Sequence, residues 1–273
     1  MALNIVDKIV ESKRKEVEQL HLQWDLPALK AAAAAAPRAR NFFTAVTRPG
    51  GKLLNVIAEV KRASPSAGVI RADFDPVAIA RQYQAAGADA LSVLTDAEFF
   101  QGSLDTLRAV RAAVDLPCLR KDFIIDPWQV YQSRAAGADA ILLIAAILPP
   151  GELMDLQILA TELRMTVLIE VHTADELLQL RSLVGFPHAS YSLLGINNRD
   201  LSTFQVDLGT TLRLADLAGE GVPIVSESGI KTRQDTERLA RAGVRAVLIG
   251  QTLMQAGDVA ACMNELVGLS RRP

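Results

Sequence analysis

The sequence of 273 residues is 50% hydrophobic and 22% charged, which is typical of a globular protein with a large core. Its formal net charge of −2 and its aromatic content of only 5% argue against a nucleic-acid-binding surface. The amino terminus has no apolar signal core, and no apolar run reaches the length that a membrane span needs. We therefore expect a soluble, cytoplasmic protein that binds neither nucleic acid nor a membrane.

The first fifty residues are expected to form a helical extension, because no strand is evident before Leu53. Residues 4–20 place apolar side chains at helical spacing among many charges, which predicts an amphipathic helix. Residues 26–36 predict a second short helix, and residues 41–46 could form one more turn. We predict that residues 1–50 pack against the domain that follows; a mobile, solvated arm is the alternative.

From Leu53 onward, apolar runs alternate with helical patterns. Eight runs predict strands, at 53–60, 89–94, 117–121, 139–145, 165–171, 193–197, 222–226 and 245–249. Helical patterns occupy 75–86, 103–114, 127–136, 151–163, 174–184, 207–218, 232–242 and, in broken form, 252–268. The motif AAGADA occurs at 85–90 and at 135–140, and its glycine is expected to end a helix. This pattern predicts an α/β fold, a single (β/α)8 TIM barrel over residues 51–273.

Polar side chains stand at the ends of the predicted strands. Side chains alternate between the two faces of a strand, so Glu170 shares the inner face with Thr166 and Leu168. The carboxyl ends of barrel strands converge on one face, where active sites lie. Five strands carry such residues, and we expect the following to meet there: Glu59, Lys61, Lys121, Glu170, Asn197 with Arg199 beyond it, and Glu227.

A phosphate site is predicted from the last two strands. In barrels of this kind, the loops after strands seven and eight often hold a phosphate group. Glycine lets the backbone approach the anion, and a helix amino terminus supplies free N–H groups. The candidates are Ser228 and Gly229 after strand seven, Gly250 and Gln251 after strand eight, and Ser64 in the first loop with Lys61 nearby.

Other residues have weaker claims to a site. Phe100 could form an aromatic substrate wall, whereas core packing is expected for Phe99 and Phe123. Arg120 is expected to face outward and to be structural. His172 follows Glu170 by two residues and could face the site.

Metal binding is not predicted. His21 lies in the extension and His188 in a helix-to-strand loop, so no two histidines have ligand spacing. Asp96, Glu98 and Asp122 could bind magnesium, but solvated loop carboxylates are the commoner case. Cys118 and Cys262 lack metal-ligand spacing and are expected to be buried free thiols.

Seven segments resemble the indole-3-glycerol phosphate synthase family. They are IAEVKRASPSAG at 57–68, LSVLTDAEFFQGS at 91–103, LRKDFIID at 119–126, LIEVH at 168–172, LGINNRDL at 194–201, VSESGI at 225–230 and LIGQTLM at 248–254. The resemblance covers essentially the whole chain. One departure is Ala67, where many members have lysine.

The resemblance implies a reaction of tryptophan biosynthesis, without a cofactor. The substrate would be 1-(2-carboxyphenylamino)-1-deoxyribulose 5-phosphate, which undergoes ring closure, decarboxylation and dehydration. It implies that Lys121 is the general acid, and that Glu170 and Lys61 transfer protons in the dehydration. Glu59 would orient Lys61 or the leaving hydroxyl, and Asn197 and Glu227 would hold substrate hydroxyls or position the lysines.

In the acid role, Lys121 can donate the proton if burial and neighbouring groups tune its pKa towards neutrality.

Two other functions stay open. One is a barrel like phosphoribosylanthranilate isomerase, which uses a cysteine and an aspartate; Cys118 is poorly placed for that. The other is a barrel that binds a phosphorylated ligand without catalysis. We expect a monomer or a weak homo-oligomer that binds a small phosphorylated molecule.

Overall fold

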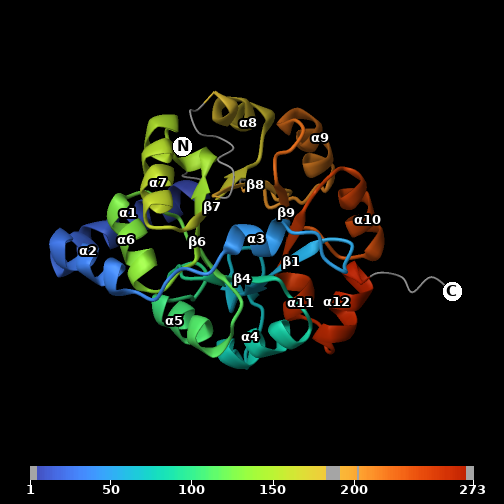
Figure 1. Ribbon diagram of the computed structural model, residues 1–273, viewed down its shortest axis with the longest axis horizontal. Helices are drawn as coiled ribbons and strands as arrows, with labels where there is room; N and C mark the ends of the chain where they lie inside the picture. Colours follow the sequence, from blue (N-terminus) through green and yellow to red (C-terminus); the bar gives the residue numbers. More distant parts are fainter. Residues whose placement is uncertain (1–4, 183–190, 202, 269–273) are drawn as a thin grey trace.

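The computed structural model describes residues 5–182, 191–201 and 203–268. Within them, eight parallel strands pair in chain order and close into a barrel, with helices around the outside (Figure 1). The predicted barrel is therefore confirmed. Its strands are β1 (Asn55–Val60), β4 (Ala90–Leu94), β5 (Cys118–Lys121), β6 (Ala140–Ile144), β7 (Thr166–Val171), β8 (Ser192–Asn197), β9 (Ile224–Glu227) and β10 (Ala246–Ile249).

The outer helices begin and end where the local chemistry predicts. The side chains of Asp75, Ser103 and Asp126 each accept a hydrogen bond from the first turn of a helix. Gly87 and Gly137, from the repeated motif, adopt φ of +88° and +89° just after their helices. These helices are α4 (Pro76–Ala85), α5 (Leu104–Ala113), α6 (Pro127–Ala135), α7 (Pro150–Glu162), α8 (Ala174–Arg181), α9 (Gly209–Ala218), α10 (Arg233–Arg241), α11 (Gln251–Met254) and α12 (Val259–Val267), with a 3-10 turn η1 (Ala145–Ile147).

Strand alternation divides the apolar residues into two layers. Val56, Val93 and Ile141 face outward and join the layer between the strands and the helices. Ile57 and Leu168 face inward and belong to the layer that fills the barrel. Both layers are buried, so the polar side chains that face inward at the strand ends lie above an apolar floor.

Three helices precede the barrel: α1 (Ile5–Gln23), α2 (Leu26–Ala35) and α3 (Phe42–Thr47). Helix α2 packs against α6, and α3 lies across the middle of the barrel in Figure 1. The Phe43 amide donates to Thr166 Oγ1, at the start of β7, over 3.2 Å. Ile9 of α1 belongs to the inner apolar layer, and α1 also borders the cavity at the carboxyl ends of the strands. The extension therefore contacts both ends of the barrel.

Several element boundaries differ from the prediction. Strand β1 begins two residues later than expected, and α1 continues to Gln23, which includes His21. A short antiparallel pair, β2 (Ala63–Ser64) and β3 (Gly68–Val69), was not predicted because its strands are too short for an alternation pattern. His188 and the end of the predicted helix 174–184 lie outside the described residues.

No helix within the described ranges is long and apolar enough to cross a membrane. The division of the chain at residue 51 stays a prediction.

Candidate active site

A cavity of about 720 Å³ opens at the carboxyl ends of the barrel strands. All of the predicted site residues line it, although they come from seven of the eight barrel strands or the segments that follow them. They are Glu59, Lys61, Ser64, Phe100, Lys121, Glu170, Asn197, Arg199, Glu227, Ser228, Gly229, Gly250 and Gln251.

Lys121 stands at the centre of the ionic groups. Its Nζ lies 2.7 Å from Glu170 Oε2 and 3.2 Å from Glu227 Oε2. These three side chains come from β5, β7 and β9 and point into the barrel, as the alternation of the strands requires. Arg120, the preceding residue, points the opposite way and donates to Ser133 Oγ of α6 over 3.0 Å, so its predicted outward, structural placement is correct.

The protonation of Lys121 differs from the prediction. Burial by itself would lower the pKa of this ammonium group, but the nearby carboxylates of Glu170, Glu227 and Glu59 outweigh burial and raise it. Lys121 is therefore held as a cation and is not tuned towards neutrality. The sequence could not indicate this, because the three carboxylates come from other strands.

The two carboxylates beside Lys121 have opposite shifts. Burial would raise the pKa of Glu170, but Lys121 and His172 outweigh it and lower the pKa below its usual range. Burial raises the pKa of Glu227 to about 8. The positive charge of Lys121 opposes this shift, but the negative charge of Glu170 adds to it. The site therefore holds one ionised and one protonated carboxyl group near neutral pH, which is the arrangement that acid–base chemistry needs.

His172 lies behind Glu170 and does not itself line the cavity. Its Nε2 is 3.3 Å from Glu170 Oε1, and its backbone N–H donates to Glu176 Oε2 over 2.7 Å. Burial would lower the pKa of His172, but these two carboxylates outweigh burial and raise it to about 10. His172 therefore acts on the site through Glu170.

Lys61 and Glu59 form a second ion pair at the end of β1. Gly250, after β10, lies against this pair: a Cβ atom there would overlap Glu59 Oε1 and come within 3.3 Å of Lys61 Nζ. The predicted phosphate glycine therefore also makes room for the Glu59–Lys61 pair.

Two residues of the LGINNRDL segment act on the site and were missed. A Cβ atom on Gly195 would overlap Glu227 Oε1, so glycine at this position leaves space for that carboxylate. Asn198 Nδ2 donates to the carbonyl oxygens of Glu227 and Ser228, each over 3.0 Å, and so joins the ends of β8 and β9. The signals in the sequence that could have indicated these two residues were a glycine within a predicted strand and a second asparagine just after its end.

The segments that follow β9 and β10 border the cavity with backbone groups. Ser228 and Gly229 both adopt positive φ, +66° and +81°, and α11 begins directly after Gly250. Asn197 Oδ1 accepts the Arg199 N–H over 3.0 Å, and the Arg199 guanidinium donates to the carbonyl of Phe204 over 3.1 Å. Two consecutive residues at positive φ turn the backbone sharply at the carboxyl end of β9.

An apolar wall faces the ionic groups. The Phe100 and Phe123 rings lie 6.2 Å apart in the lining of the cavity, together with Ile5 and Val6 of α1. Phe123 belongs to the inner apolar layer, as predicted, and also borders the cavity. The extension therefore contributes directly to this wall.

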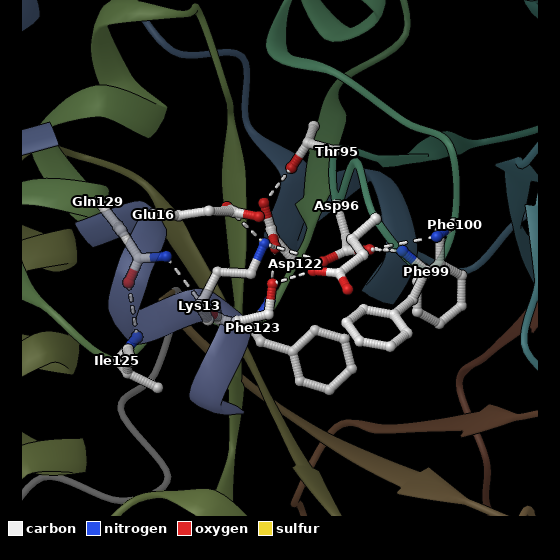
Figure 2. Close-up of polar contacts among 12 residues, drawn as sticks. Lys13, Glu16, Thr95, Asp96, Phe99, Phe100, Asp122, Phe123, Ile125 and Gln129 are labelled. Carbon is white, nitrogen blue, oxygen red and sulfur yellow. Dashed lines mark hydrogen bonds and ion pairs between the residues drawn. The ribbon is translucent and has the colours of Figure 1, made fainter. Parts of the chain in front are cut away.

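Asp96 and Asp122 were predicted to be solvated loop carboxylates, and this was wrong. Both are buried at the carboxyl ends of β4 and β5, where Lys13 of α1 lies between them (Figure 2). Glu98 is exposed and accepts a hydrogen bond from Ser12. Among the residues that the structure describes, no group of three or more side chains could hold a metal ion.

The two cysteines are free in the structure. Cys118 is fully buried at the start of β5, as predicted, and burial raises the pKa of its thiol to about 12. It does not line the cavity, so it cannot serve there as the acid of an isomerase. Cys262 is only partly buried.

The sequence matches one family over nearly its whole length. The family model described as indole-3-glycerol phosphate synthase covers residues 6–266. A protein of that description from Desulforamulus reducens is 46% identical over 264 residues, 96% of this chain and 97% of the relative. One from Crocosphaera subtropica is 48% identical over 262 residues, 94% of this chain and 87% of the relative.

Solved structures share the barrel at low sequence identity. Thiamine phosphate pyrophosphorylase from Pyrococcus furiosus superposes with a TM-score of 0.55 at 15% identity, over 79% of this chain and 95% of that one. This likeness supports the fold alone.

Proposed function

The chain belongs to the indole-3-glycerol phosphate synthase family, and we propose that the cavity around Lys121 is where it carries out that family's reaction. As a member, it is a carboxy-lyase of tryptophan biosynthesis that acts on a phosphorylated substrate. That substrate is 1-(2-carboxyphenylamino)-1-deoxyribulose 5-phosphate, and its conversion to indole-3-glycerol phosphate releases carbon dioxide and water.

Lys121 is the general acid of ring closure in this proposal. The ring carbon that bears the carboxylate attacks the ketone of the sugar chain, and the ketone oxygen must take up a proton as the bond forms. Lys121 is suited to this step because it is held as an ammonium group, with the ionised Glu170 at 2.7 Å and the Glu227 carboxyl group at 3.2 Å. This observation carries the proposal. Loss of carbon dioxide then restores the aromatic ring.

Dehydration requires a base and an acid, and the ionic groups supply both. Glu170, which stays ionised, accepts the proton, and Lys61 assists departure of the hydroxyl. Glu59 contacts Lys61 and orients it or the leaving hydroxyl. Asn197 and Glu227 hold substrate hydroxyls or position the lysines.

The two ends of the cavity suit the two ends of the substrate. We assign the phosphate to the backbone around Ser228, Gly229, Gly250 and Gln251, with Ser64, Arg199 and Lys61 nearby. The apolar wall that includes Phe100 takes the aromatic ring. The reaction as proposed requires no cofactor.

We further propose that the enzyme works in the cytoplasm, as is typical of this biosynthetic family, and as a monomer or weak homo-oligomer. Light scattering over a range of protein concentrations tests the second statement: a dimer that persists on dilution contradicts it.

The test of the proposed function is turnover by the purified protein. Formation of indole-3-glycerol phosphate is measured by its indole fluorescence, with release of carbon dioxide as a second readout. We expect the Lys121→Ala variant to be slower by about a hundredfold or more, the scale of a positioned acid. The matched control is Lys15→Ala, which removes a lysine whose side chain is 71% exposed on α1.

Each outcome is informative. Wild-type turnover with a near-normal rate in Lys121→Ala would remove this residue from the acid role. Substrate binding without turnover in the wild type would favour a non-catalytic binding barrel and contradict the proposal.

A further inference from the structure

Lys13 of α1 has a charged side chain with no exposed surface, which is rare for a lysine. Its Nζ lies 2.9 Å from Asp96 Oδ2 and 2.9 Å from Asp122 Oδ1. A third carboxylate, that of the half-exposed Glu16, lies 2.7 Å away. A buried ammonium group is strongly unfavourable unless it is paired in this way, so the position is specified by the two aspartates.

Lys13 stays protonated at this position. Burial would lower its pKa, but Asp122, Asp96 and Glu16 outweigh burial and raise it. Arg120 adds a second cation, 2.9 Å from the other oxygen of Asp122. The buried charges of Lys13, Arg120, Asp96 and Asp122 therefore balance.

Each aspartate also fixes the backbone of the apolar wall (Figure 2). Asp96 Oδ1 accepts the N–H groups of Phe99 and Phe100 over 2.8 and 3.1 Å. Asp122 Oδ1 accepts the N–H of Phe123 over 2.8 Å, and Asp122 directly follows Lys121 in the chain. One ammonium group thus joins the two carboxylates that hold the aromatic residues of the cavity.

We propose that Lys13 is a positioning residue that fixes the spacing of the Phe100 and Phe123 rings, and thereby the pocket for the aromatic part of the substrate. The inference rests on the proposed function for the identity of that part. It extends the catalytic machinery to the extension, because α1 supplies both the ammonium group and, through Ile5 and Val6, part of the same wall.

The physical reason is the state that removal of the ammonium group leaves behind. Without Lys13, Asp122 keeps Arg120 as a partner, while Asp96 Oδ2 loses its cation and faces the Asp122 carboxylate in a buried space, so the two repel or one must take up a proton. Either response disturbs the hydrogen bonds to the Phe99, Phe100 and Phe123 amides. The phosphate end of the cavity, after β9 and β10, shares none of these contacts.

This difference between the two ends gives the test. We would compare Lys13→Met, which keeps the length of the side chain and removes its charge, with Lys15→Met on the exposed side of the same helix. Calorimetry measures the affinities of two fragments of the substrate, 2-aminobenzoate for the aromatic end and inorganic phosphate for the other end. Steady-state kinetics with the whole substrate are measured in parallel.

We expect Lys13→Met to weaken binding of 2-aminobenzoate by about tenfold, the scale of a lost aromatic contact, and to raise KM for the substrate. Phosphate affinity should stay at the wild-type value, and Lys15→Met should change none of these quantities. A lower melting temperature with unchanged binding and kinetics would overturn the proposal, since it would make Lys13 merely structural. Equal weakening of both fragments would also overturn it, because it would indicate general loosening.

A second variant serves if Lys13→Met does not fold. Asp96→Asn keeps an oxygen acceptor for the Phe99 and Phe100 amides but turns an amide donor towards Lys13. It should weaken 2-aminobenzoate selectively, in the same direction; wild-type affinity for this fragment in Asp96→Asn would contradict the proposal. Failure of the wild type to turn over the substrate would instead count against the proposed function, while the two fragment affinities would still test Lys13.

Discussion

Replacement of Gly195 with alanine should displace the Glu227 carboxylate and impair catalysis. Gly195 lies in β8 with Glu170 beside it on β7. A Cβ atom at this position would overlap Glu227 Oε1 and come within 3.2 Å of Leu168 Cδ1. Because the leucine is packed in the barrel and the carboxylate is the end of a longer side chain, we expect the carboxylate to move.

The magnitude has two parts. An added methyl group in a packed interior costs about 1–3 kcal/mol, which corresponds to a fall in melting temperature of about 2–12 °C for a chain of this size. The catalytic part follows from the distance of 3.2 Å between Glu227 Oε2 and Lys121 Nζ, since displacement of Glu227 would remove this contact and leave the ammonium group with the Glu170 contact at 2.7 Å. We expect kcat/KM to fall by at least about tenfold, a fraction of what a positioned acid contributes.

The assay is a double-mutant cycle. Measurement of kcat/KM for Gly195→Ala, Glu227→Gln and the double variant tests whether the alanine acts through Glu227, since residues in contact give non-additive effects. The alanine should cost much less in the Glu227→Gln background. Gly151→Ala is the matched control, because Gly151 is exposed and a Cβ atom there meets nothing within 4 Å. Wild-type activity in Gly195→Ala, or the same loss in both backgrounds, would refute the reasoning.

Two further predictions concern Gly250 and Glu227. Gly250→Ala should lower kcat as well as raise KM, because the new methyl group would overlap the Glu59 carboxylate beside Lys61; unchanged kcat in steady-state kinetics would limit Gly250 to substrate binding. The pKa of Glu227 is about 8 in the folded protein, against an ordinary value of 4.5 for an exposed glutamate, so folding favours the protonated form. The stability that the protonated side chain contributes is therefore lost as pH rises between these two values. Between about pH 6 and about pH 9 the wild type should therefore lose about 2–3 kcal/mol of unfolding free energy relative to Glu227→Gln. Urea unfolding of both proteins measures this, and a difference that does not vary with pH would contradict the raised pKa.

The sequence predicted the barrel because the barrel is a repeated local pattern. Apolar runs such as 165–171 alternate with helical spacing, and Gly87 and Gly137 mark the helix ends within a few residues of the strands that follow. The sequence also predicted that the candidate residues lie on one face, because the carboxyl ends of parallel strands in a closed barrel converge whatever the details of packing. All of those residues line the cavity, while their catalytic roles await the experiments above.

Only the tertiary structure decided the electrostatics. The pKa of Lys121 was expected near neutrality and is raised instead, because its carboxylate partners come from β1, β7 and β9. Asp96 and Asp122 resemble solvated loop residues in the sequence. They are buried because a lysine from the extension reaches them across the rim of the barrel.

The arrangement of side chains also divides into features that the sequence determined and features that the tertiary structure determined. The sequence by itself determined the order of strands and helices and the residue types at the strand ends, because both depend on neighbours close in the chain. The tertiary structure determined that Gly195 makes room for Glu227 and that Lys13 joins the two aspartates. Burial and charge depend on which distant segments meet, and that is fixed only when the barrel closes and α1 packs against its carboxyl-terminal face.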